Sequence, residues 1–265
     1  HSTTSRGGDD AESTVDQQDD VSTKSHIVYC RRKRSLHINV DECTKVEFDT
    51  LINRIDKLND DVVKMQIYRT AEPRKGCVRT LSELILFFSA VRGLSNLQDM
   101  TLWNFNPEST EVLTSLVTNH PTLESFQLHY VRGSVDREFL DGLAGAPKVR
   151  NVVLEMQQEF LLSTLLASKT ITSLKVGGNF FFGKRTFLQF TLLLGTNSVL
   201  RTLDLKPTIR IIGLRALSLA INENNTLRKL KFSFRPSNSD EAGLALTGLS
   251  KALSNNSSIE HLENR

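Results

Sequence analysis

One segment of the sequence has the glycine and lysine spacing of a phosphate-binding loop. Gly178 is followed by Gly183 and Lys184, the spacing at which backbone amides and a lysine hold nucleotide phosphates. The next residue is Arg185 rather than the serine or threonine that would bind Mg²⁺, and phenylalanines fill the loop. We therefore expect no nucleotide site and no cofactor, and interpret the segment as a turn between a strand and a helix.

The histidines offer no catalytic or metal-binding pattern. The sequence contains His1, His26, His37, His120, His129 and His261. No two of them are four residues apart, the spacing that places two metal ligands on one face of a helix. No GxSxG motif supplies a nucleophile either. We expect no metal site and no catalytic residues, and therefore a protein that is not an enzyme.

The cysteines indicate neither a disulfide framework nor a zinc site. Cys30, Cys43 and Cys77 show no CxxC spacing, which favours a reducing compartment. We expect an intracellular, cytoplasmic protein in which Cys43 and Cys77 are small core residues.

Composition and charge narrow the class of protein. The 265 residues are 39% hydrophobic and 24% charged, which excludes collagen-like, mucin-like and wholly disordered chains. No apolar run approaches the ~18–20 residues that span a bilayer. The net charge of +3 is uneven, because residues 1–25 carry six acidic and two basic side chains, leaving +7 on residues 26–265. We predict that residues 1–25 form a disordered acidic tail.

Residues 26–60 resemble a capping segment. Strands are expected at Ile27–Cys30 and Leu36–Val40, with a helix from about Thr44 to Leu58. Between the strands, Arg31–Arg34 is a basic run that fits either a solvated turn or an anion-binding or nuclear-import patch. One apolar helix face is expected from Val46, Phe48, Leu51, Ile52, Ile55 and Leu58.

An apolar-x-x-apolar-x-apolar pattern recurs eight times along residues 61–265, on average about every 28 residues. The copies are Val62/Met65/Ile67, Leu97/Met100/Leu102, Leu123/Phe126/Leu128, Val149/Val152/Leu154, Ile171/Leu174/Val176, Leu200/Leu203/Leu205, Leu227/Leu230/Phe232 and a truncated Ile259/Leu262. The stretches between them have the apolar spacing of helices. We predict an array of about eight strand–helix units.

A polar residue recurs where each predicted helix gives way to the next strand. Asn197, Asn224 and Asn256 stand there, and such side chains can bond backbone groups left open at a helix end. The glycosylation sequons that begin at Asn224, Asn255 and Asn256 coincide with this turn, which gives them a sufficient structural reason.

This combination of strand motif, turn and Gly/Ala/Leu-rich helix resembles the ribonuclease-inhibitor-like leucine-rich repeats over residues ~60–265. The resemblance implies an α/β leucine-rich-repeat right-handed solenoid, or horseshoe, with a parallel concave sheet and outer helices. The sequence departs from the family after the strands, where the expected asparagine occurs only at Asn179.

A TIM barrel is the alternative architecture, since eight strand–helix units in ~250 residues also satisfy it. Strands covered on both faces are continuously apolar. Here polar residues such as Arg201, Thr202 and Asp204 interrupt the strands. The pattern therefore favours an open solenoid with one solvated face.

In a leucine-rich horseshoe, the third, fifth, seventh and eighth positions of each strand segment face the concave side. Tyr68, Trp103 and His129 share the seventh position of neighbouring strands, and Tyr130 follows at the eighth. We predict an aromatic anchor here and a basic region toward the C-terminus. The candidate partner-binding residues are Tyr68, Trp103, His129, Tyr130, Glu155, Lys175, Lys206, Lys229 and Lys231.

The resulting functional hypothesis is a non-enzymatic module that binds a protein partner on its concave face. The alternative is a regulator of another enzyme, either an enzyme inhibitor or a small-GTPase activator, because Ran GTPase-activating proteins have a similar repeat. Nucleic acid is not expected as a partner, and no membrane span is expected.

Overall fold

The computed structural model describes residues 26–58, 61–69, 79–105, 110–131, 135–156, 162–178, 183–234 and 240–264. The described strands are β1 (Ile27–Cys30), β2 (Ser35–Asn39), β3 (Lys64–Tyr68), β4 (Asp99–Trp103), β5 (Ser125–Val131), β6 (Asn151–Met156), β7 (Ser173–Gly177), β8 (Thr202–Ile209), β9 (Lys229–Phe234) and β10 (His261–Asn264). The described helices are α1 (Lys45–Ile55), α2 (Leu81–Arg92), α3 (Thr110–Asn119), α4 (Arg137–Gly145), α5 (Leu162–Leu166), α6 (Lys184–Thr196), α7 (Ile211–Glu223) and α8 (Asp240–Asn255), with the 3₁₀ turns η1 (Arg31–Lys33) and η2 (Asp56–Leu58).

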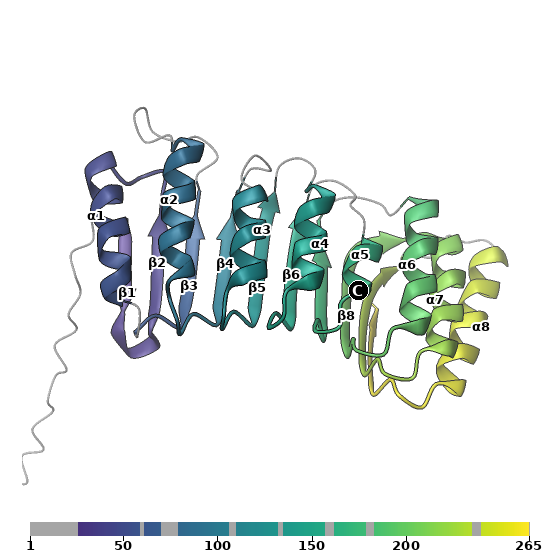
Figure 1. Cartoon of the computed structure of the whole chain (residues 1–265). Helices are drawn as coiled ribbons and strands as arrows, with labels where there is room; N and C mark the ends of the chain where they lie inside the picture. The colour runs from purple at the N-terminus through teal and green to yellow at the C-terminus, as the bar shows by residue number, and fades with distance from the viewer. Residues whose placement is uncertain are drawn as a thin grey trace, which may run out of the picture.

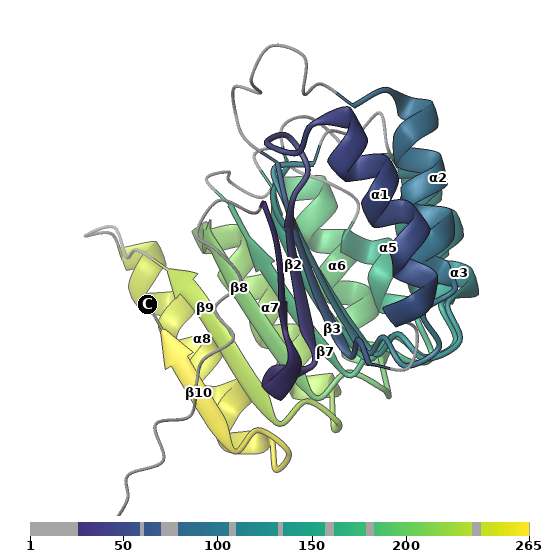
Figure 2. The same cartoon turned by 90° about the vertical axis from the view of Figure 1, so that its left-hand side faces the viewer.

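The strands form one open sheet in chain order from β1 to β10. β1 runs antiparallel to β2, and every later pair is parallel. The helices cover one face of this sheet and leave the other face open (Figures 1 and 2). This arrangement is an α/β solenoid of the leucine-rich-repeat type, and the linear strand order excludes a closed barrel.

The repeated apolar residues form the core between the sheet and the helices. In the unit of β4, for example, Leu97 just before the strand and Met100 and Leu102 within it are all fully buried. Met100 pairs in register with Met65 on one side and Phe126 on the other. The predicted repeat is therefore confirmed for its first seven copies, whose equivalent residues stack into one continuous core, whereas Leu262 of the truncated eighth copy is 42% exposed.

The structure adds one feature to the prediction for the N-terminal segment and corrects another. Its second strand joins the parallel sheet, since Leu36 and Ile38 pair with Met65 and Ile67 and are as deeply buried. Val46 does not belong to the apolar face of α1, because it is 75% exposed; it lies about 200° around the helix from Phe48. The basic run forms an exposed turn through η1 between β1 and β2.

The first two helices begin with reciprocal side-chain caps. The Thr80 hydroxyl accepts from the Glu83 amide at 3.2 Å, and the Thr80 amide donates to the Glu83 carboxylate at 2.8 Å. Thr44 and Glu47 make the same exchange before α1. These capping boxes satisfy backbone amides that a helix start leaves open.

The asparagine turns join neighbouring repeats. The Asn224 side-chain oxygen accepts from the amides of Thr226 and Leu227 at 3.0 and 2.8 Å. Its Nδ2 donates to the carbonyls of Leu194 and Asn197 in the preceding repeat at 2.7 and 2.9 Å. One buried side chain therefore shapes its own turn and attaches it to the turn before.

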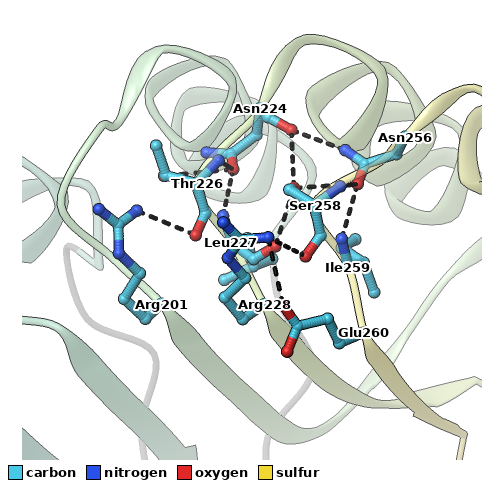
Figure 3. A network of polar contacts seen from close by, with 9 residues as sticks. All are labelled: Arg201, Asn224, Thr226, Leu227, Arg228, Asn256, Ser258, Ile259 and Glu260. Atoms are coloured by element: carbon cyan, nitrogen blue, oxygen red, sulfur yellow. Dashed lines mark hydrogen bonds and ion pairs between the residues drawn. The ribbon is translucent and has the colours of Figure 1, made fainter.

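The same bonds recur along the C-terminal half of the array. Asn197 and Asn256 each accept from two amides of their own turn and donate to the preceding repeat. Figure 3 shows that Arg201 and Arg228 each reach a backbone carbonyl of the following repeat. The predicted role of these turn residues is thus confirmed, and the two arginines add further hydrogen bonds between neighbouring repeats.

Cysteines contribute little beyond packing. Cys43 is buried, as predicted, and its thiol donates to the Asn39 carbonyl at 3.2 Å, whereas Cys30 is partly exposed. Cys77 lies outside the described residues, as does the predicted acidic tail of residues 1–25.

Candidate functional site

Six of the predicted binding residues lie together on the open face of the sheet. Tyr68, Trp103 and His129 pair in register across β3, β4 and β5. The line continues through Glu155 of β6 to Lys206 of β8, with Tyr130 beside His129. We name Tyr68, Trp103, His129, Tyr130, Glu155 and Lys206 the central row.

The aromatic half of the central row is a stack of rings. The Trp103 and His129 rings are nearly parallel, at 11°, with their centroids 4.1 Å apart. Tyr68 stacks on the other side of Trp103, at 5.8 Å and 12°. The stack arises because each parallel strand presents the same position to the same face at one strand spacing.

A bulge in β5 places Tyr130 next to this stack. Leu128 pairs with Leu154 and Val131 with Met156, so two residues of β5 lie opposite one residue of β6. Tyr130 adopts a left-handed backbone with φ of 55° and is 55% exposed. Its ring lies 5.7 Å from that of Trp103.

Glu155 joins the aromatic half of the row to Lys206. Its carboxylate contacts His129 Nδ1 at 2.8 Å and forms an ion pair with the Lys206 ammonium. Burial raises the pKa of Glu155, but hydrogen bonds and charges from His129 and Lys206 outweigh this effect and hold the pKa below its usual value. The carboxyl group is therefore anionic at neutral pH.

A second irregularity positions Lys206. Leu205 pairs with Phe232 and Thr208 with Ser233, so Lys206 and Pro207 stand outside the β8–β9 register. Proline has no amide hydrogen to donate, so it suits a position without a ladder bond. The bulge leaves the Lys206 side chain exposed on the concave side.

The other predicted lysines do not join the central row. Lys175 lies in register with Asp204, and Asp204 with Lys231. Lys231 forms an ion pair with Glu263 of β10. Lys229 is partly buried at the start of β9. The predicted basic region is thus interspersed with carboxylates: Asp204 stands among the lysines, as its strand position predicts, and Glu263 adds a second.

The eighth strand position does not always face the concave side. Met156 and Phe234 occupy it and are buried in the core at 1% and 4% exposure. The bulge of β5 and the bulge of β8 shift their register with these neighbours. The expectation of a uniform concave position was therefore wrong for β6 and β9.

Arg69, also at the eighth position, is held by a residue that sequence reasoning missed. Its Nε lies 3.3 Å from the carboxylate of Asp41, whose side chain is fully buried. The guanidinium also lies over the Phe105 ring, 5.9 Å from its centroid. Asp41 precedes Arg69 by 28 residues, and no local motif connects the two.

Other chemistry finds little support in the described part of the chain. There, no three His, Cys, Asp or Glu side chains are grouped to hold a metal, and no helix has the length and apolarity to cross a bilayer.

Most of the loop between Gly178 and Gly183 lies outside the described residues. Asn224 is 2% exposed and fully bonded, so its sequon belongs to the turn.

Comparisons with known proteins give structural likenesses at low identity. No protein-family model and no curated protein sequence matches the chain. Similar solved structures include the C-terminal domain of tropomodulin from Caenorhabditis elegans (12% identity, 79% of this chain, 92% of that chain, TM-score 0.36). Others are the yeast Rad7–Elc1 complex (12%, 85% and 68%, TM-score 0.41) and leiomodin-1 actin-binding site 2 (11%, 78% and 90%, TM-score 0.23). At these TM-scores, the likenesses support no inference about function.

Proposed function

We propose that the concave face binds a protein partner, with the central row as the contact. The observation that carries this proposal is the exposed, left-handed Tyr130 beside Trp103. A left-handed backbone costs a bulky residue on the order of 1–2 kcal/mol. An exposed ring also forgoes the stabilisation of burial. A partner that covers Tyr130 would offset both costs.

The residue types of the row match those that dominate protein interfaces. Tryptophan and tyrosine supply large apolar areas with few rotatable bonds, and they are enriched among energetic hot spots. Trp103 is the only tryptophan of the sequence. The stack with Tyr68 and His129 holds its ring in place before any partner arrives, which lowers the entropy lost on binding.

The charges of the face favour an acidic partner. The Lys206 side chain is 39% exposed, whereas that of its partner Glu155 is 13% exposed. Asp204 pairs in register with Lys175 on one side and with Lys231 on the other, and it is 8% exposed. At Lys206 the cationic group therefore faces solvent while the carboxylate lies beneath it, whereas in the Lys231–Glu263 pair the lysine is the less exposed partner, at 19% against 35%. A partner segment with an apolar side chain for Tyr130 and a carboxylate for Lys206 fits this arrangement.

The repeats are further proposed to be of the ribonuclease-inhibitor-like type. The repeat spacing of about 28 residues and the asparagine turns support this assignment. The assignment concerns the scaffold alone, since one scaffold serves many functions.

The proposed function is tested by affinity capture with three forms of the chain. Wild type is compared with Trp103→Ala/Tyr130→Ala and with Leu192→Ala/Leu219→Ala. The two leucines are each 69% exposed on the helices α6 and α7, so their variant is a matched control on the other face.

The proposal predicts a partner that the leucine control captures and the aromatic variant loses. A hot-spot residue contributes about 2 kcal/mol or more, or roughly 30-fold in affinity. Partners that bind the aromatic variant as tightly as wild type would contradict it. Raising the salt from 0.15 to 1 M shortens the screening length from about 8 to 3 Å, so binding that depends on Lys206 should weaken.

A further inference from the structure

We propose that Glu155 is the positioning residue of the central row and that Gly177 gives it room. The proposal rests on the proposed binding function. It adds that the aromatic anchor and Lys206 are presented to a partner as one unit, because a single carboxylate holds both.

The carboxylate of Glu155 reaches in two directions across the sheet. Toward β5 it contacts His129 Nδ1 at 2.8 Å. Toward β8 it pairs with Lys206, although β7 lies between β6 and β8. Glu155 and Gly177 are register partners. The side chain therefore lies over Gly177 of β7 on its way to Lys206.

Glycine is required at position 177 for space rather than for backbone conformation. A Cβ atom added there would lie 2.7 Å from Glu155 Cγ and 3.1 Å from Oε1. Real Cβ contacts are essentially never shorter than 3.0 Å. The left-handed glycine of this turn is the next residue, Gly178, with φ of 134°. Any side chain at position 177 would therefore displace the Glu155 side chain.

Glu155 acts on the anchor through His129. The imidazole is 7% exposed and is held by Glu155 at Nδ1, with Gln127 3.4 Å from Nε2. Its face lies 4.1 Å from that of Trp103. Freeing the Nδ1 contact allows the imidazole to rotate, and the Trp103 ring loses its fixed neighbour. Glu155 thus controls a ring that it does not touch.

The single tryptophan makes this arrangement measurable without a partner. Trp103 is the only tryptophan, so tryptophan emission, excited at a wavelength that tyrosine does not absorb, reports on the central row. We choose Glu155→Ala, Gly177→Ala and their double variant. Glu263→Gln alters another lysine-paired carboxylate away from the row. Gly243→Ala adds a methyl group where nothing lies within 4 Å.

Emission wavelength and acrylamide quenching are measured on each variant, with circular dichroism as a check of folding. We expect Glu155→Ala and Gly177→Ala to increase the quenching of Trp103 and to shift its emission, while both controls match wild type. The double variant should equal Glu155→Ala, because the side-chain atoms that lie nearest to the added methyl group are then gone. If Glu155→Ala does not fold, Glu155→Gln preserves the size and tests the charge.

Unchanged Trp103 fluorescence in folded Glu155 and Gly177 variants would overturn the positioning role. So would a Gly177→Ala effect that persists undiminished in the Glu155→Ala background. These results are distinct from failure of the proposed function. The proposed function fails if a captured partner binds Trp103→Ala/Tyr130→Ala as tightly as wild type. With a partner in hand, the proposal also predicts that Glu155→Ala weakens binding.

Discussion

The asparagine turns give the sharpest prediction about stability, which concerns Asn224→Ala. The Asn224 side chain is 2% exposed and makes four bonds to backbone groups of two repeats. Alanine removes all four bonds and leaves the turn without its internal acceptor. The neighbouring Asn225 is exposed, so Asn225→Ala changes the same residue type with no comparable loss.

The expected cost follows from which groups lose their only partner. The amides of Thr226 and Leu227 lose the Asn224 oxygen. The carbonyl of Leu194 still accepts from the Asn197 amide at 3.2 Å, and the carbonyl of Asn197 from the Thr226 hydroxyl at 3.0 Å. An unsatisfied buried amide costs about 1–3 kcal/mol. Two such amides, of which Thr226 is partly accessible to water, give about 3 kcal/mol.

The assay is urea unfolding followed by far-ultraviolet circular dichroism. With a slope of about 3 kcal/mol/M, the loss lowers the midpoint of Asn224→Ala by about 1 M. Asn225→Ala should remain within about 0.5 kcal/mol of wild type. Equal midpoints for the two variants would refute the reasoning that these side chains hold the repeats together.

Two further predictions concern a helix contact and a buried histidine. Gly142→Ala should destabilise the fold, because its methyl group would lie 2.7 Å from Thr114 Cγ2. Gly243→Ala meets nothing within 4 Å and should stabilise α8 by up to about 1 kcal/mol; thermal unfolding of both variants tests the pair. Burial lowers the pKa of His120, and the nearby Val91 backbone opposes this effect only in part. The unfolded chain therefore binds more protons than the folded chain as pH falls below about 6.5, and stability decreases there. Unfolding midpoints between pH 7.5 and 5.5 should show this decrease, and a decrease of the same size in His120→Gln would contradict the assignment.

The sequence contained enough information for the scaffold because one short pattern determines it. The spacing of Met100 and Leu102 places both on the same side of a strand, with Leu97 buried in the turn before it, and repetition of the pattern stacks the strands. Asn224 at the helix end indicated a turn bond, which the structure contains. Local spacing and repetition suffice for both features, since each depends on residues close in the chain.

The arrangement of the site depended on information that spacing does not hold. The bulge at Tyr130 is a register shift between β5 and β6, and no sequence motif in β5 predicts it. The span of Glu155 over Gly177 joins residues of three strands. Arg69 pairs with Asp41 in another unit, where the eighth-position rule expected an exposed side chain. Side-chain length and packing between repeats decide such contacts, so the sequence indicated the residues and only the structure gave their geometry.

The central claim is that a protein partner contacts Tyr130 on the concave face. Site-specific photo-crosslinking tests it most directly, with p-benzoylphenylalanine replacing Tyr130 in one form of the chain and Leu219 in another. Both positions are well exposed, at 55% and 69%, and lie on opposite sides of the molecule. The account predicts that a captured partner is crosslinked from position 130 and not from position 219. Crosslinking from position 219 with none from position 130 would contradict it.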